Sequence, residues 1–413
     1  MKTEPSRPHY AWIVLAMATM VVFGALGLAR FGYASLLPAM QQDLHLANVH
    51  TGLLATANLV GYLLFSFLGG ALASHFGPRA VIAAGLALAG TGMALTGLAH
   101  SLASIMLWRA VTGIGSGASN VPVMGLLAAW FAPRRRGAAA GVAVAGSSLG
   151  LMFVGPVVPR VLDAAGAAGW RACWFLFGGV ALALAGAAAA LLRNRPAEEG
   201  LPIFGLRPGD PEPESPSGRL RLRLVYGSGA VWALGLVYIA FGFSYIIYMT
   251  FFIKHLVSGA GYSAQGAGRL FFIMGVCSLF CGLIWGSLSD RIGRRSALAA
   301  VYVVQAASYA LFAFCAAPWG LTLSAVLFGL TAWSIPAIMA AACGDVLGPR
   351  LAPAGLGFVT LFFGVGQALG PSVAGAMADA FGSLSSAFLL SAAIATAGSV
   401  GALLLPTPRH TAA

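Results

Sequence analysis

The sequence predicts an all-α membrane protein with twelve transmembrane helices, arranged as two pseudo-symmetric six-helix bundles. Three observations predict this fold class. The 413-residue chain is 59% hydrophobic and 8% charged, whereas soluble domains carry about 25% charged residues. Apolar runs of about 20 residues recur along the whole chain, each long enough to cross roughly 30 Å of hydrocarbon. A polar turn is repeated at half-chain spacing, which indicates two copies of one unit.

The apolar runs divide into six before and six after one long polar stretch. The first run begins near Tyr10 and has no small-residue cleavage site, so we expect a retained helix rather than a signal peptide. The stretch from Arg193 to Arg223 is rich in Pro, Gly and Glu and cannot bury a core, so we expect a disordered linker. The expected spans are residues 10–38, 50–73, 79–99, 102–129, 137–160, 171–192, 226–254, 264–288, 296–316, 320–343, 354–377 and 384–405.

Lysine and arginine are distributed unequally between the two sides of these spans. Seventeen lie on the side that carries both termini, and four lie on the other: Arg160, Arg171, Lys254 and Arg269. Positive charge collects in cytoplasmic loops. We therefore expect both termini to be cytoplasmic, with a bundle at 1–192, a cytoplasmic linker at 193–225 and a second bundle at 226–413, in the cell's inner membrane. The net charge of +12 is dispersed over short loops, which does not suit a nucleic-acid partner.

The five cysteines all fall inside predicted helices. Cys277 and Cys281 share a helix face at i, i+4, but two thiols without a histidine or carboxylate make a poor metal site. We expect the cysteines to be small packing residues, and we expect the protein to bind no metal and no cofactor. The chain also lacks a G-x-x-x-x-G-K-[ST] motif, so direct ATP drive is not supported.

The repeated turn begins at Gly286, where the sequence reads GSLSDRIGRR, and its weaker copy begins at Gly70, where it reads GALASHFGPR. Similar offsets relate Pro122 to Pro336 and the Gly-Pro pair at 155–156 to that at 370–371. The loop at 286–295 matches G-x-x-x-D-R-x-G-R-R without a gap and resembles the signature loop of the major facilitator superfamily. The resemblance covers essentially the whole chain. It implies two six-helix halves that expose a central site to each side of the membrane in turn.

In the resembled family these loops latch the cytoplasmic ends of the two halves. Ser74 and His75 replace the acidic and basic pair in the first copy, so the resemblance implies that the second copy carries the charged latch. Asp345, at the end of the tenth span, is a possible partner of Arg291 or Arg294. The alternative is that basic loop residues only hold the topology. The expected latch residues are Gly286, Asp290, Arg291, Gly293, Arg294 and Asp345.

Only two ionisable residues are expected deep in the membrane, Arg30 in the first span and Arg109 in the fourth. Such a residue costs at least ~2.5 kcal/mol at the bilayer centre, so it is a candidate for function. The spans run in opposite directions, which places both arginines at similar depth in the outer half. A guanidinium offers a two-pronged fork to a carboxylate or similar oxyanion. The alternative for Arg109 is that it binds backbone carbonyls and stabilises packing.

Neutral polar and aromatic side chains on potential cavity helices form a second group of candidates. Tyr245 and Tyr248 are three residues apart and are expected to share a face opposite the first span. An Asn or Tyr between helices is more often interhelical glue than a ligand, and that alternative stays open. The group is Tyr33, Asn58, Tyr62, Asn120, Tyr245, Tyr248, Trp333, Ser334 and Gln367.

Together with the family resemblance, these residues predict a secondary carrier for a small organic anion, most simply a carboxylate. Arg30 and Arg109 are expected to bind it, with Tyr33, Asn120, Tyr245, Tyr248 and Trp333 around its body. No mid-membrane carboxylate or imidazole is available to carry a proton, although the substrate could bring a co-transported proton. The main alternative is a multidrug or metabolite exporter with an aromatic pocket. No catalytic group is visible, so we expect no enzyme, and we expect a monomer.

Overall fold

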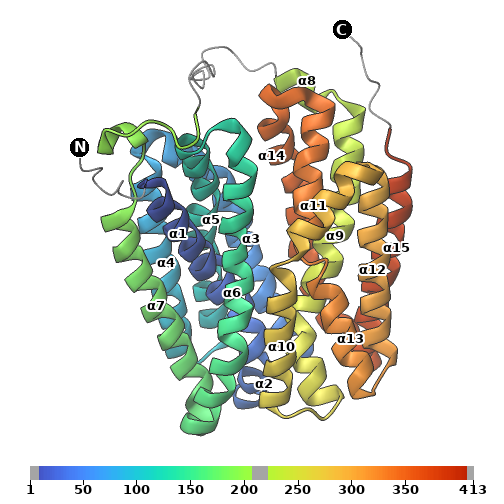
Figure 1. Cartoon of the computed structure of the whole chain (residues 1–413). Helices are drawn as coiled ribbons and strands as arrows, with labels where there is room; N and C mark the ends of the chain where they lie inside the picture. The colour runs from blue at the N-terminus through green and yellow to red at the C-terminus, as the bar shows by residue number, and fades with distance from the viewer. Residues whose placement is uncertain (1–8, 207–221, 407–413) are drawn as a thin grey trace, which may run out of the picture.

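The computed structural model describes residues 9–206 and 222–406, and these are almost entirely helical (Figure 1). The first half contains α1 (Ala11–Val22), η1 (Phe23–Phe31), α2 (Gly32–Asp43), α3 (Asn48–Phe76), α4 (Pro78–Leu98), α5 (Leu102–Trp130), α6 (Pro133–Ala165), η2 (Gly166–Ala168) and α7 (Gly169–Leu191). The connecting segment contains η3 (Pro196–Glu199) and α8 (Leu222–Tyr226). The second half contains α9 (Gly229–Lys254), η4 (His255–Gly259), α10 (Ala264–Ser278), α11 (Cys281–Ile292), α12 (Arg294–Phe314), α13 (Pro318–Gly329), α14 (Ser334–Phe381) and α15 (Ser385–Leu403).

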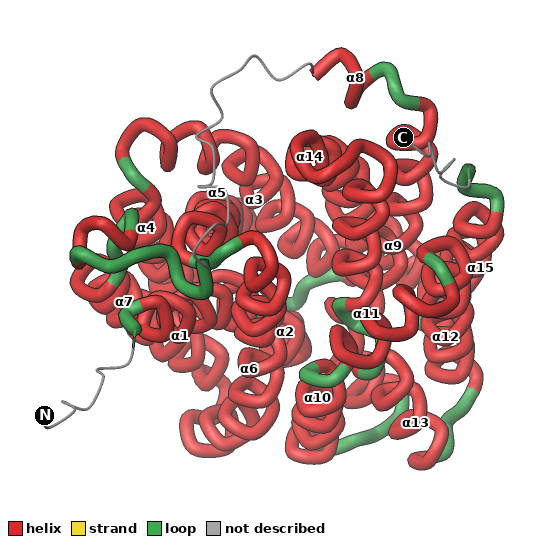
Figure 2. Tube along the Cα trace, turned by 45° about the horizontal axis from the view of Figure 1, so that its top comes forward, coloured by secondary structure: helices red, strands yellow, loops and turns green. Residues whose placement is uncertain are grey.

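These helices make the twelve spans that the sequence predicts. Ten stretches are long and apolar enough to cross a membrane, and the bent pair α10 and α11 makes an eleventh. The 29-residue helix α5, which carries Arg109, completes the set. The expected spans 320–343 and 354–377 are joined in α14, which turns at Gly348 where φ is 74°. The two halves lie side by side in Figures 1 and 2.

Two faces of the molecule serve as reference below. The linker face carries η3, α8 and the described chain ends at residues 9 and 406, and it lies at the top of Figure 1. The far face lies at the opposite end and carries the loops at 44–47, 260–263 and 382–384.

Glycines allow the helices of the first half to pack backbone to backbone. A Cβ added to Gly113 of α5 would lie 1.9 Å from the carbonyl oxygen of Asn58 in α3. A Cβ added to Gly150 of α6 would lie 2.2 Å from the Cα of Gly27 in η1. No real side chain fits at such distances, so the close helix contacts require glycine at these positions.

The first span is not one regular α-helix. Its middle, η1, is a nine-residue π-helix that ends just beyond Arg30. A π-helical segment is a rare, wider winding that occurs often at functional sites. The sequence predicts that this span ends at residue 38, which is too early, because the helix continues through Pro38 to Asp43.

Two spans of the second half are broken near mid-membrane. The eighth bends by 41° between α10 and α11, and the tenth is interrupted by residues 330–333 between α13 and α14. The breaks lie beside each other, since the Trp285 indole donates a 2.9 Å hydrogen bond to the carbonyl of Leu330. This contact satisfies a carbonyl near the break, as non-helical backbone at membrane depth requires.

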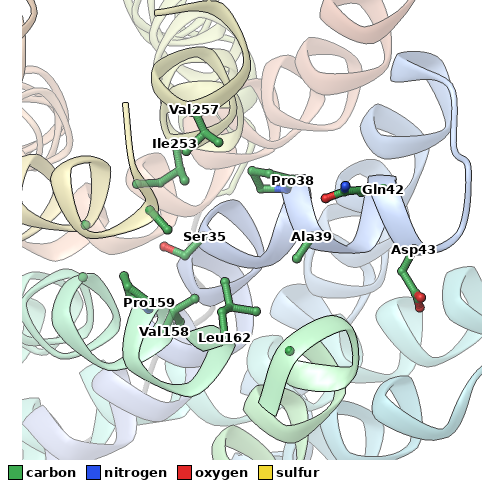
Figure 3. Close-up of a pocket in the computed structure, with 14 residues that line it drawn as sticks. Ser35, Pro38, Ala39, Gln42, Asp43, Val158, Pro159, Leu162, Ile253 and Val257 are labelled. Atoms are coloured by element: carbon green, nitrogen blue, oxygen red, sulfur yellow. The ribbon is translucent and has the colours of Figure 1, made fainter. Parts of the chain in front are cut away.

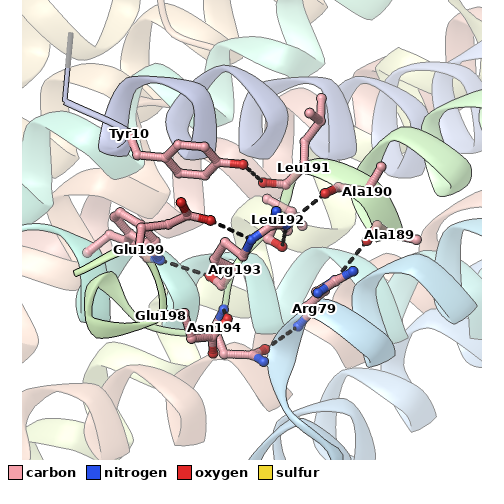
Figure 4. Close-up of polar contacts among 11 residues, drawn as sticks. Tyr10, Arg79, Ala189, Ala190, Leu191, Leu192, Arg193, Asn194, Glu198 and Glu199 are labelled. Carbon is pink, nitrogen blue, oxygen red and sulfur yellow. Dashed lines mark hydrogen bonds and ion pairs between the residues drawn. The ribbon is translucent and has the colours of Figure 1, made fainter. Parts of the chain in front are cut away.

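The first part of the expected disordered linker is folded, which corrects that prediction. Residues 193–206, here called the strap, lie along the linker face of the first half (Figure 1), and Figure 4 shows Arg193, Asn194, Glu198 and Glu199 of this segment. Arg193 pairs with Glu199 at 2.7 Å, and its carbonyl accepts from the Trp130 indole at 2.9 Å. Phe204 exchanges backbone hydrogen bonds with Trp130 and Ala132, at 2.9 and 3.0 Å.

The strap is ordered because it buries apolar groups that a count of Pro, Gly and Glu does not reveal. Phe204 packs against the rings of His9, Trp12 and Phe131, with centroids 5.1, 5.2 and 5.6 Å away. Pro196 is buried as well. In the rest of the expected linker, residues 207–221 lie outside the described residues, and residues 222–225 belong to α8.

Candidate functional site

Arg30 lies at the interface between the two halves. The π-helical winding of η1 carries it, and its guanidinium carbon lies 4.3 Å from the ring centre of Tyr62 in α3. Its Nη1 lies 3.5 Å from the hydroxyl of Tyr245 in α9, which belongs to the other half. A cation over an aromatic face gains electrostatic attraction, and this contact fixes the plane of the guanidinium.

The remaining edge of Arg30 has no partner. Its Nε and Nη2 atoms are buried and make no hydrogen bond to any described residue. These two N–H groups form the parallel fork that binds a carboxylate through both of its oxygens. Buried polar groups are nearly always paired, so this edge of Arg30 is free to bind an acceptor. Nε of Arg109 is likewise buried without a partner among the described residues.

Arg109 lies behind Arg30, inside the first half. Its side chain is 1% exposed, and its Nη1 donates a 2.7 Å hydrogen bond to the carbonyl of Ala29, next to Arg30 in the chain. The rings of Tyr33 and Trp174 lie 4.8 and 5.1 Å from its guanidinium carbon. The sequence correctly placed both arginines at similar depth. The geometry, however, corresponds to the alternative for Arg109, in which it binds a backbone carbonyl and supports η1.

Two amide side chains hold the tyrosines that surround Arg30. Asn120 donates a 2.9 Å hydrogen bond to the hydroxyl of Tyr62, and its own amide oxygen is buried without a partner. Gln367 of α14 donates to the hydroxyl of Tyr245. The site thus draws on α3, α5 and η1 from one half and on α9 and α14 from the other.

Trp333 closes one side of this group. It lies in the break before α14, and its ring centre is 5.5 Å from that of Phe31 and 6.4 Å from that of Tyr245. Its indole donates a 3.2 Å hydrogen bond to Ser148 of α6, which also accepts from Ser278 at 2.7 Å. Sequence reasoning missed the two serines, because a single serine in a glycine-rich helix carries no distinctive pattern.

The structure places two expected contact residues away from the interface. Tyr248 is fully buried inside the second half, with its hydroxyl 2.7 Å from Ser324. Three residues along a helix leave two side chains about 60° apart around its axis. The structure uses this difference to direct Tyr245 to Arg30 and Tyr248 to Ser324 within the second half, so, contrary to the expectation, Tyr248 does not face the first span. Tyr33 is 2% exposed and donates to the carbonyl of Thr51 at 2.7 Å, so it packs within the first half.

The expected latch residues form a cluster inside the second half. Arg294 pairs with Asp345 at 3.1 Å and with Asp290 at 2.5 Å, whereas Arg291 is exposed. The partner of Asp345 is thus Arg294. Gly293 has φ 85°, a left-handed conformation that suits glycine and lets the loop turn between α11 and α12. A Cβ added to Gly286 would meet nothing within 4 Å, so packing does not demand a glycine there.

Among residues 9–206 and 222–406, the hydrogen bonds between the halves lie between mid-membrane, where Ser148 bonds Ser278 and Trp333, and the far face. Near the far face, Asp379 of α14 accepts from the backbone amides of Asn48 and Val49 at 3.0 and 2.7 Å, and Gln265 of α10 donates to Asp163 of α6. The amide of Asn48 adds a 2.7 Å bond, and Lys254 donates to Asn48. The halves are thus held together from the level of Ser148 to the far face, and among the described residues no such bond lies between Ser148 and the linker face.

A cavity of about 500 Å³ lies between the halves near the far face (Figure 3). It follows α2 from the buried Ser35, whose hydroxyl has no partner, to the exposed Gln42 and Asp43. Val158 and Ile253 contribute apolar walls from α6 and α9. The cavity does not contain Arg30 or the residues around it, so it is separate from the candidate site.

Comparison with known proteins agrees with this architecture. The family model of the Major Facilitator Superfamily matches residues 19–323 and 234–413. The chain belongs to this superfamily of membrane transporters.

Three transporters illustrate the range of its relatives. A probable sulfoacetate transporter of Cupriavidus necator is 26% identical, over 89% of this chain and 87% of its own. A hexuronate transporter of Bacillus subtilis is 23% identical, over 90% and 89%. Monocarboxylate transporter 13 of Rattus norvegicus is 25% identical, over 98% and 91%.

Two solved structures of transporters have a fold similar to that of this chain. A bacterial homolog of the human lysosomal transporter Spinster, inward-facing and unoccupied, superposes with a TM-score of 0.75 at 16% identity, over 97% of this chain and 96% of that one. The nucleoside transporter NupG gives 0.73 at 13% identity, over 96% and 99%.

Proposed function

We propose that this protein transports a small organic anion, most simply a carboxylate, across the cell's inner membrane by alternating access. The observation that carries the proposal is the buried, unpartnered Nε–Nη2 fork of Arg30. The names of the sulfoacetate, hexuronate and monocarboxylate transporters add support, because each of these cargoes carries an anionic group.

The proposed orientation places the linker face in the cytoplasm. The sequence assigns seventeen lysines and arginines to the side of the termini and four to the other, as the positive-inside rule expects of a cytoplasmic side. The hydrogen bonds that join the halves near the far face then belong to an inward-open state. The cluster of Arg294, Asp290 and Asp345 would meet the first half only when the linker face closes.

Substitution of Arg30 tests this function. Arg30→Lys keeps the charge but removes the fork, so we expect anion affinity to fall at least ten-fold, because two parallel charge-assisted hydrogen bonds become one point contact. Thermal-shift titration of purified protein with lactate, glucuronate and sulfoacetate measures binding, and uptake into proteoliposomes measures transport. Arg269→Lys is the matched control at an exposed arginine. Unchanged binding and uptake in Arg30→Lys would refute the assignment.

A drug or metabolite exporter is the second candidate. The rings of Tyr238, Phe241, Tyr245 and Phe363 stack nearly parallel, with interplanar angles of 5 to 19°. Such a stack suits flat, apolar cargo. Stabilisation by neutral or cationic aromatic compounds, with no response to anions, would favour this candidate.

A further inference from the structure

The cavity near the far face lies between the halves but away from Arg30 (Figure 3). It follows α2 from Ser35 to Asp43, and the helical rise between these residues is about 12 Å. Its volume of about 500 Å³ falls within the range of about 300–1,000 Å³ that is usual for sites that hold small ligands. The cavity is therefore large enough for a small, elongated molecule.

The walls of this cavity are apolar and come from both halves. Val158, Pro159 and Leu162 of α6 form the wall of the first half. Ile253 of α9 and Val257 of η4 form the facing wall of the second half. Removal of hydrocarbon from water against such walls is favourable. The walls thus predict an apolar body for a ligand.

The mouth of the cavity is acidic. Asp43 lies at the exposed end and is the one charged side chain among the described residues that line the cavity. Its Oδ2 accepts a 2.9 Å hydrogen bond from the Trp170 indole, and among the described residues nothing bonds its Oδ1. Asp163, which follows the lining residue Leu162, adds a second exposed carboxylate beside the cavity. Carboxylates at an entrance attract a cation and repel an anion.

The neighbouring arginine does not neutralise Asp43. The guanidinium of Arg171 lies 3.9 Å from Oδ2 of Asp43, beyond hydrogen-bond distance. It stacks over the Trp170 ring, and its Nη1 donates to the carbonyls of Gly97 and Ala99 at 2.9 and 2.7 Å. Both charged groups are partly exposed, so the attraction between them is weak. Asp43 therefore remains free to bind a cationic group of a ligand.

The cavity belongs to the closed form of the far side. On one flank α6 and α10 touch backbone to backbone, since a Cβ added to Gly268 would lie 2.1 Å from the carbonyl oxygen of Gly155. Both glycines line the cavity. When the halves separate at the far face, as proposed for the transport cycle, this contact opens and the walls from α6 and α9 part. A ligand that loses its apolar contacts in this way favours the closed form.

We propose that this cavity binds an amphiphilic cation, and that the bound cation holds the far side closed. Its apolar body lies between α6 and α9, and its charged group lies beside Asp43. The ligand differs from the proposed cargo, because the acidic mouth disfavours an anion. The conformational part rests on the proposed function, since it assumes that the halves separate at the far face, whereas the binding part does not.

Binding to purified protein in phosphatidylcholine nanodiscs tests the site. Tritiated decyltrimethylammonium is the probe, decanesulfonate is the anion of equal chain length, and binding to empty nanodiscs is subtracted. We expect the cation to bind about ten-fold more tightly than the anion. Asp43→Asn can still accept from Trp170 but lacks the charge, so the affinity for the cation should fall about five-fold. Glu199→Gln, which removes a negative charge on the linker face, is the matched control.

Two further variants fill the cavity. Ala39→Phe and Ala264→Phe each place a ring in the space that the alkyl chain would occupy. We expect both to lose saturable binding of decyltrimethylammonium. Absence of such binding to the wild-type protein, or wild-type affinity in Asp43→Asn or in a monodisperse filled variant, overturns the site. Equal affinity of the wild-type protein for decanesulfonate overturns the preference for a cation.

Labelling of Thr56→Cys tests whether the ligand holds the far side closed. Thr56 faces Ser372 across the interface, and it does not line the cavity. The background lacks the five native cysteines. A membrane-impermeant maleimide is applied to intact cells or everted vesicles, whichever preparation labels the exposed far-face reporter Ser383→Cys. We expect decyltrimethylammonium to slow labelling of Thr56→Cys about five-fold and to leave that of Ser383→Cys unchanged.

The outcomes separate this inference from the proposed function. Unchanged labelling of Thr56→Cys, with binding of decyltrimethylammonium intact, overturns the conformational part alone. Loss of the binding result overturns the site and leaves anion transport standing. Neither measurement uses uptake, so a failure of lactate transport would overturn the proposed function and leave the cation site in place.

Discussion

Arg30 and Arg109 show how two buried arginines at one depth come to have different roles. Arg109 is enclosed by Tyr33 and Trp174, and it bonds the carbonyl that precedes Arg30 in the chain. It therefore stabilises the π-helical segment, whereas Arg30 keeps an unpaired edge at the interface. In the proposed function, Arg30 binds the anion through groups that are poorly satisfied in the free protein, and its neighbour Arg109 supports the backbone that carries it.

Stability measurements should separate the two roles. The shorter side chain in Arg109→Gln does not reach the Ala29 carbonyl as the guanidinium does. We expect the free energy of unfolding to fall by about 1–3 kcal/mol and the Tm to fall with it. Arg30→Gln removes an unpaired buried charge, so the Tm should stay the same or rise. Differential scanning fluorimetry of both variants in one detergent is the measurement. A Tm that falls more in Arg30→Gln than in Arg109→Gln would contradict the assigned roles.

At the scale of elements, the far face is held by a helix cap that crosses between the halves. The carboxylate of Asp379, near the end of α14, accepts from the first amides of α3. A carboxylate at a helix N-terminus satisfies unpaired donors and interacts favourably with the helix dipole. The same chemistry that caps a helix within a domain here joins two bodies that separate in the proposed transport cycle.

Removal of this cap should shift the conformational equilibrium. Asp379→Ala removes the inter-half acceptor, and we expect the far-face-open population to rise five- to thirty-fold, which corresponds to about 1–2 kcal/mol. Labelling of a Ser35→Cys reporter by a membrane-impermeant maleimide, in a background without the five native cysteines, measures far-face access. Glu199→Ala is the control, since Glu199 pairs with Arg193 within the first half. No increase in labelling beyond that of the control would remove Asp379 from the gate.

At the scale of the whole molecule, two six-helix bodies meet along the interface that contains Arg30. Thr56 of α3 and Ser372 of α14 face each other there, with their hydroxyl oxygens 2.7 Å apart. In depth across the membrane, both residues lie between Arg30 and the cap formed by Asp379. The proposed alternating-access cycle requires this contact to open and reform each time.

A reversible crosslink at this contact tests the rocking motion. Cysteines at both positions, Thr56→Cys and Ser372→Cys, have side chains close enough for a disulfide of about 2.0 Å. We expect oxidation to abolish anion transport and a reducing agent to restore it, because the far face is then locked and released. Each single substitution controls for the loss of a hydroxyl. Full transport in the crosslinked protein would show that the halves need not separate here.

Much of the fold could be predicted from local patterns. The spacing of apolar runs, the repeated loop at Gly286 and the distribution of arginines each depend on a few neighbouring residues. Arg30 was found the same way, because a charge inside an apolar run is conspicuous. The strap was missed, because its order depends on Phe204 meeting Trp12 and Phe131, which are distant in sequence.

The sequence by itself determined twelve spans in two related halves and the presence of two deep arginines. Only the tertiary structure decided that Arg109 supports the backbone, that Tyr248 packs inward and that Arg30 keeps a free fork. The physical reason is the range of each interaction. Membrane insertion depends on the hydropathy of one segment at a time, whereas the pairing of a buried charge depends on which helices from both halves surround it.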